Sequence, residues 1–64
     1  MIHQLEKNTQ FIAMRNVERA RTYRVWIHRG SAVAVFDYKA PSGEAAIAQA
    51  RAELEQAERV LSAI

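Results

Sequence analysis

The chain has 64 residues, half of them hydrophobic and a quarter charged, and only three are Gly or Pro. This composition is typical of a single folded domain spanning residues 1–64, and it argues against a disordered chain. The absence of Cys excludes disulfides and thiolate metal sites, and it fits a reducing compartment. Because so short a chain builds only a small core, we expect support from a second copy or from a larger partner.

We expect neither a membrane-spanning segment nor a signal peptide in this sequence. No apolar run approaches the roughly 18 residues that cross a bilayer, and the first seven residues are too polar for a signal peptide. The expected location is the cytoplasm, or the host cytoplasm if a phage encodes the protein. Charge is unevenly spread: residues 1–42 carry seven Lys or Arg against three acids, and residues 43–64 carry two Arg against four Glu. A basic portion is therefore followed by an acidic one.

The first third of the chain fits two structures. The stretch 9–15 (Thr-Gln-Phe-Ile-Ala-Met-Arg) can form a third strand beside the hairpin that follows. Alternatively, residues 1–21 can form a helix that lies over Trp26, Val33 and Val35. The run Phe-Ile-Ala-Met at residues 11–14 has no hydrophobic period that would distinguish a strand from a helix. We favour the strand, which predicts the order βββα.

Residues 22–39 predict a β-hairpin with strands at about 22–29 and 32–39. Both segments are rich in β-branched and aromatic residues, which favour strands. Gly30-Ser31 suits a two-residue type II′ turn, because Gly tolerates the positive φ at its first position. The resulting register pairs oppositely charged or apolar residues across the strands: Arg24 with Asp37, Val25 with Phe36, and Tyr23 with Tyr38.

The two faces of this hairpin differ in character. One face is a continuous apolar bed for a helix, made by Tyr23, Val25, Ile27, Ala34, Phe36 and Tyr38. The opposite face mixes apolar and charged residues, namely Arg24, Trp26, His28, Val33, Val35 and Asp37. A solvated face does not normally hold a Trp and two Val. We therefore expect a partner, a second copy or the N-terminal segment to cover it.

Residues 43–63 predict a long C-terminal helix. Ser42 can cap its first turn, Glu44 complements the helix dipole, and Ala is the strongest helix former. Its apolar residues follow a spacing of three and four: Ile47, Ala50, Leu54, Ala57, Leu61 and Ile64. This stripe can lie across the sheet, or it can form the seam of a homodimer through Ile47, Leu54 and Leu61.

Catalytic and metal-binding patterns are missing from the sequence. No cluster of His, Asp and Glu around His3 or His28 has ligand spacing, and no Ser or Thr is accompanied by an orienting acid and base. We expect neither an enzyme nor a metal or other cofactor. Arg and Trp are enriched where proteins bind one another, and the candidate contact residues are Arg19, Arg21, Arg24, Trp26, His28 and Arg29. A protein partner is favoured, and direct nucleic-acid binding by the same Arg and aromatic residues is the alternative.

The order of the elements resembles two groups of small proteins. The segment Gly43-Glu44-Ala45-Ala46 at the helix start is similar to that of HicB-type antitoxins, although the Pro-Gly-Cys stretch between sheet and helix is missing. In size and element order the chain resembles small phage-encoded anti-CRISPR and other anti-defence proteins. That resemblance implies an α+β inhibitor that docks on a nucleic-acid-processing protein complex. The HicB resemblance implies an antitoxin, and a structural homodimer subunit is a further alternative.

Overall fold

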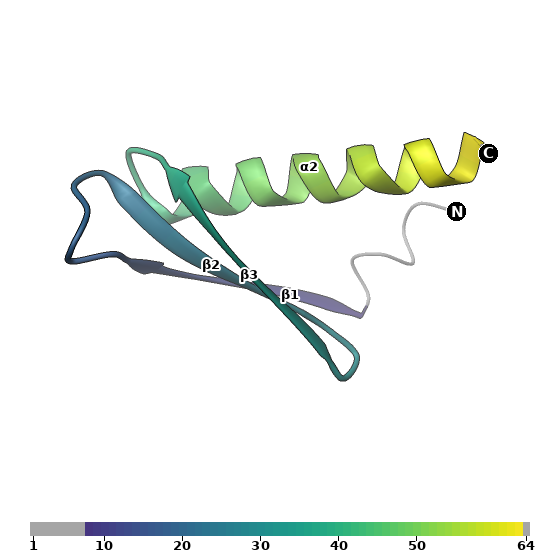
Figure 1. Cartoon of the computed structure of the whole chain (residues 1–64), viewed down its shortest axis with the longest axis horizontal. Helices are drawn as coiled ribbons and strands as arrows, with labels where there is room; N and C mark the ends of the chain where they lie inside the picture. The colour runs from purple at the N-terminus through teal and green to yellow at the C-terminus, as the bar shows by residue number, and fades with distance from the viewer. Residues whose placement is uncertain (1–7, 64) are drawn as a thin grey trace.

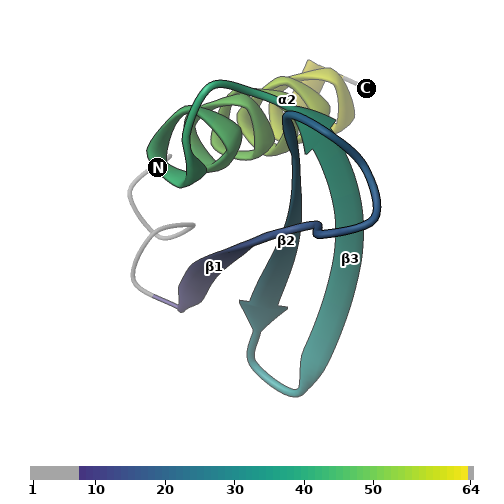
Figure 2. The same ribbon diagram turned by 90° about the vertical axis from the view of Figure 1, so that its left-hand side faces the viewer.

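In a computed structural model, which describes residues 8–63 and the side chains of residues 8–60, three strands precede one helix. The strands β1 (Thr9–Arg15), β2 (Thr22–Arg29) and β3 (Ala32–Lys39) form an antiparallel sheet in the order β1-β2-β3, followed by α2 (Gly43–Ala63) (Figure 1). The helix lies along one side of the twisted sheet (Figure 2). The α+β fold and the third strand are thus confirmed. A helix throughout 1–21 is wrong for residues 9–15, and residues 1–7 lie outside the described part.

The hairpin adopts the register expected from its sequence. Arg29 pairs with Ala32 across the Gly30-Ser31 turn, and Arg24 pairs with Asp37. Gly30 has a φ of 61°, whereas Ser31 is not among the described residues with positive φ, as a type II′ turn requires.

A compact turn joins β1 to β2. The backbone N–H of Asn16 donates to the carbonyl of Thr22 at 2.8 Å, and the Asn16 side chain accepts from the N–H of Glu18 at 3.0 Å. The turn ends at Arg21, which has the left-handed φ of 56°. This conformation costs a non-Gly residue about 1–2 kcal/mol. The carbonyl of Arg21 accepts from the N–H of Ala40 at 3.0 Å, which holds the turn against the end of the hairpin.

Small residues let α2 approach the sheet closely. Ala46 and Ala50 are buried against the fully buried Val25 of β2, together with Ile27 and Ala40. The helix begins as its sequence predicts, because the Ser42 hydroxyl accepts from the N–H of Ala45 at 3.1 Å. Because the helix residues at this contact are Ala, the core between α2 and the middle of the sheet is thin.

The helix is anchored mainly over β1 and β2. An ideal Cβ on Gly43 would lie 3.5 Å from the Ala13 side chain of β1, and the Arg51 guanidinium lies 5.1 Å from the Phe11 ring centre. Ile47 and Leu54 of the helix stripe pack against the core. Ala57 of this stripe is exposed, and the side chains of Leu61 and Ile64 lie outside the described part.

Candidate binding surface

The sheet face turned away from α2 carries three cross-strand rows of side chains. We call this surface, which no other described element covers, the open face. One row is Ile12, Trp26 and Val35, and the rows on either side of it are Gln10, His28 and Val33, and Met14, Arg24 and Asp37. The central row is apolar throughout. Ile12 and Val35 at its two ends are each 47% exposed, and Trp26 between them is partly buried.

Two thirds of the open face was predicted from the sequence, and the third contributed by β1 was not. The sequence predicted one face for Arg24, Trp26 and His28 with Val33, Val35 and Asp37, and the structure brings these six together. Ile12 and Met14 of β1 extend the same face and were missed as contact residues. Ile12 and Met14 are two residues apart, and residues with this spacing lie on the same face of a strand. The spacing therefore predicts their position only if stretch 9–15 is known to be a strand.

One end of the open face is held by an ion pair. The Arg24 Nε lies 2.9 Å from the Asp37 Oδ1, and the Arg24 Nη2 lies 3.3 Å from Oδ2. This contact lowers the pKa of the Asp37 carboxyl, through the hydrogen bond first and the nearby charge of Arg24 as well. It raises the pKa of Arg24 for the same reasons. The two charges offset each other, so the open face is dominated by its apolar centre.

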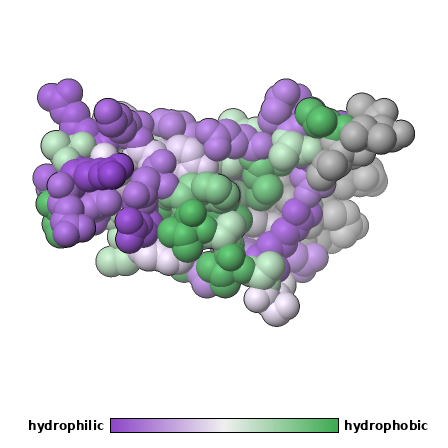
Figure 3. Space-filling model, in the orientation of Figure 1, coloured by the Kyte–Doolittle hydropathy of each residue, from purple (hydrophilic) through white to green (hydrophobic). Residues whose placement is uncertain are grey.

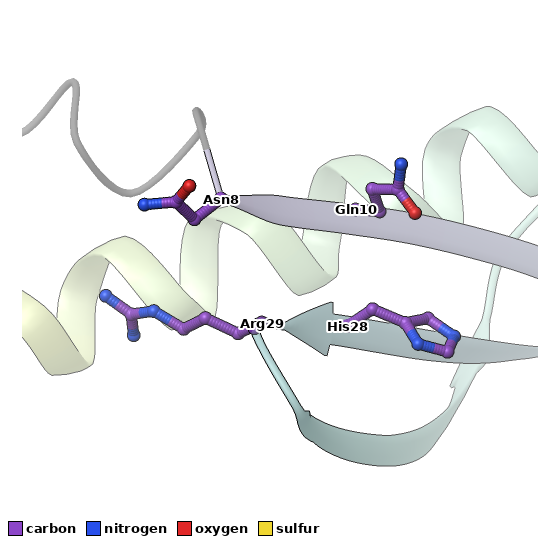
Figure 4. A pocket seen from close by; sticks show the side chains of 5 residues that line it. Asn8, Gln10, His28 and Arg29 are labelled. Atoms are coloured by element: carbon purple, nitrogen blue, oxygen red, sulfur yellow. The ribbon is translucent and has the colours of Figure 1, made fainter.

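The arginines predicted from the sequence as contact residues do not all lie on the open face. Arg29 extends toward α2, where its guanidinium forms an ion pair with Glu58. Figure 4 shows Arg29 pointing away from His28, which lies beside Gln10 of the neighbouring strand. These side chains, with Asn8 and Gly30, border a shallow hollow at the end of the sheet.

A second cluster of positive charge lies at the opposite end of the sheet. We call it the basic hollow, and it is lined by Arg15, Arg21, Tyr23, Lys39, Ala40 and Pro41. Among the described residues, none of its three cationic side chains makes an ion pair. Arg21 is the only one of the three selected from the sequence. Arg19 lies in the exposed turn between Asn16 and Arg21.

The proposed dimer seam is partly occupied within the chain. Ile47 and Leu54 pack against the sheet core. The side chain of Leu61, the third seam residue, lies outside the described part of α2.

The described residues show neither a metal-binding cluster nor a membrane-spanning helix. In residues 8–63 no group of three or more His or acidic side chains is placed to hold a metal ion. None of the helical segments described is long and apolar enough to span a membrane.

Comparison with known proteins leaves the surface as the only guide to function. No protein-family model, curated protein or solved structure matches the chain. The functional argument therefore rests on the open face and on the basic hollow.

Proposed function

We propose that this protein is a non-catalytic binding protein whose open face docks on a protein partner. The observation that carries the proposal is the apolar row Ile12, Trp26 and Val35, which three strands assemble on the side that α2 does not cover. Exposed apolar surface costs free energy in water, so an extended patch on a small monomer is typical of an interaction site.

The composition of the open face fits recognition of a protein. Trp26 offers a large rigid surface at the centre, and hot spots in protein interfaces are enriched in Trp and Arg near their centres. The pair of Arg24 and Asp37 at one end supplies hydrogen-bonding groups to the rim, where interfaces are polar. The chain resembles anti-defence proteins in size and element order. We therefore propose further that the partner belongs to a nucleic-acid-processing complex, which this protein inhibits or regulates.

The test compares two serine variants of similarly exposed residues. Ile12→Ser alters the open face, whereas Val60→Ser alters α2, and the two side chains are 47% and 54% exposed. Immobilised protein is incubated with lysate of the source cell, and bound proteins are identified by mass spectrometry. We expect one protein to be retained by the wild type and by Val60→Ser and lost with Ile12→Ser and Trp26→Ala. Circular dichroism must show that both open-face variants are folded. Equal retention by all four proteins would contradict the proposal.

A second candidate function, direct nucleic-acid binding, is supported by the basic hollow. Arg15, Arg21 and Lys39 come from three different segments and surround Tyr23, so cations for phosphate lie beside a ring for base stacking.

This candidate predicts a specific dependence on salt. If three cations contact phosphates, a plot of the logarithm of the affinity for single-stranded DNA against the logarithm of the salt concentration should have a slope of about −2. Arg21→Gln and Lys39→Gln should each reduce that slope, whereas Arg59→Gln on the exposed side of α2 should not. Fluorescence anisotropy of a labelled oligonucleotide measures both. Absence of binding at low salt would exclude this function and leave the open-face proposal untouched.

A further inference from the structure

Strand β3 forms a free edge of the sheet with ready hydrogen-bonding groups. In an antiparallel pair, alternate residues direct their backbone groups toward the partner strand and the others direct them away. The N–H of Ala40 donates to the carbonyl of Arg21, which fixes the alternation. By this alternation Ala32, Ala34, Phe36 and Tyr38 bond to β2. Val33, Val35 and Asp37 therefore direct their N–H and C=O groups outward.

Within the described part of the chain, the middle of this edge is exposed on both of its faces. Val33 and Val35 are exposed on the open face, and Phe36 is 50% exposed on the side that carries α2. Figure 3 shows hydrophobic side chains gathered beside α2 where β3 crosses in front of the other strands. Natural sheets normally block such an edge with a charge, a Pro, a bulge or a covering segment. The segment Ala32–Phe36 contains no charge and no Pro, and its pairing with β2 is continuous.

We propose that β3 pairs antiparallel with β3 of a second copy of this chain, giving a continuous six-stranded sheet with Val35 on the two-fold axis. A second copy is the occupant because the edge is complementary to itself. In this register Ala34 lies opposite Phe36 of the other copy, and Ala32 lies opposite Tyr38, so a large side chain meets a small one on the α2 side each time. On the open face Val35 meets Val35, and Val33 lies opposite Asp37.

Neighbouring registers satisfy fewer of these conditions. A shift by one residue would place side chains of the two copies on opposite faces, because residues on a strand alternate in direction. A two-fold axis at Phe36 would bring the two Phe36 rings together. It would set Lys39 as well as Asp37 opposite a Val, whereas the axis at Val35 sets only Asp37 opposite one. An axis at Ala34 would leave Tyr38 outside the ladder. The axis at Val35 pairs residues 32–38 of both strands.

The pairing also accounts for a chain this small without disulfides. Only five hydrophobic residues are buried within the described part of one copy, and domains of this size often depend on oligomerisation. Joining the edges would bury Phe36, and it would place the central rows of two open faces end to end. This inference does not depend on the proposed function, since Ala34 and Phe36 lie on the other side of the sheet from Trp26.

The test uses sedimentation equilibrium of the full chain with a pair of matched lysine variants. Ala34→Lys places a charge at the proposed interface, whereas Ala52→Lys places one on the exposed side of α2. We expect the wild type and Ala52→Lys to be dimers at micromolar to millimolar concentration. Ala34→Lys should weaken the dimer at least about tenfold, since a buried unpaired charge is costly. A wild type that is monomeric throughout, or a dimer that Ala34→Lys leaves intact, would overturn the proposal.

Charge swapping tests the register itself and guards against a variant that fails to fold. Phe36→Glu should also lose the dimer. A mixture of Ala34→Lys with Phe36→Glu should recover it, because the proposed register sets the introduced lysine of one copy opposite the introduced glutamate of the other while preserving one Phe–Ala contact. Native mass spectrometry identifies a one-to-one heterodimer. Failure of the folded mixture to associate would overturn the register with its axis at Val35.

Discussion

Val25 and Phe36 are direct cross-strand partners on the same face of the sheet, yet Val25 is completely buried and Phe36 is 50% exposed. In this row the cover provided by α2 therefore ends between β2 and β3, whereas farther along β3 the helix still reaches Tyr38 through Glu53. Because of this boundary, β1 and β2 carry the core, while β3 is left with one edge and parts of both faces in solvent. The surfaces available for binding follow from where the helix lies.

Truncating Val25 should be far more costly than truncating an exposed Val. Val25→Ala removes two methyl groups from a fully buried site and should lower the free energy of unfolding by about 1–3 kcal/mol. The matched control Val60→Ala, on the exposed side of α2, should change it by less than about 0.5 kcal/mol. Urea denaturation at one protein concentration measures both. Equal effects would mean that α2 does not pack on β2 as described.

The two glycines should respond to alanine in opposite directions. Gly30 has a φ of 61° with open space around it, so Gly30→Ala should destabilise the fold by about 1 kcal/mol through backbone strain alone. Gly43 is helical, and an added Cβ would make only ordinary contacts with Ala13 and Tyr23. Gly43→Ala should therefore be neutral or stabilise by up to about 1 kcal/mol. Thermal unfolding of both variants decides this, and a stabilised Gly30→Ala protein would rule out the type II′ turn.

Tyr38 should ionise only in strongly alkaline solution. Partial burial, together with the hydrogen bond that its hydroxyl donates to Glu53 at 3.0 Å, raises the pKa of Tyr38 to about 12. Since the unfolded value is about 10, Tyr38 stabilises the fold below pH 10 and loses this contribution as the pH rises toward 12. Absorbance titration of the wild type against Tyr38→Phe isolates the group. Glu53→Gln should lower the pKa only in part, because burial is the larger cause.

The ion pair of Arg24 with Asp37 should make stability depend on pH at the acid end. Because the pKa of Asp37 is lowered in the folded protein, its contribution is present above the unfolded value of 3.8 and is lost as the pH falls through the folded value. Asp37→Asn should remove this dependence. The difference in unfolding midpoint between wild type and variant should therefore shrink as the solution is acidified. A difference that stays constant across that range would show that the pair does not form in solution.

Much of the fold could be predicted because local patterns and the final packing agree. Alternating apolar residues with Gly30-Ser31 between them defined the hairpin and its register, and Ser42 with the Ala-rich segment defined the helix. Stretch 9–15 was ambiguous, because Phe11, Ile12 and Ala13 are consecutive apolar residues. The structure divides them between the two faces of the sheet.

Features that depend on the placement of one element on another could not be predicted. Phe36 is half exposed because of where α2 lies on the sheet. The alternation of residues along a strand predicts which face Phe36 is on, but it does not predict whether a helix covers it. Arg29 was grouped with Arg24 and His28, but it reaches Glu58 on the helix. The basic hollow joins Arg15 and Arg21, which flank one turn, with Lys39, which is distant in the sequence and meets them only because the strand ends coincide.

The most direct test of the account uses the one Trp of the chain as a probe of the open face. Trp26 lies in the central row, so its emission reports whether that surface is occupied. The wild-type protein is titrated with the partner retained in the capture experiment, produced in a Trp-free form, and Trp26 emission and iodide quenching are recorded. The account predicts a shift to shorter wavelength and a loss of quenching on binding. Saturable binding that leaves the emission and quenching of Trp26 unchanged would contradict it.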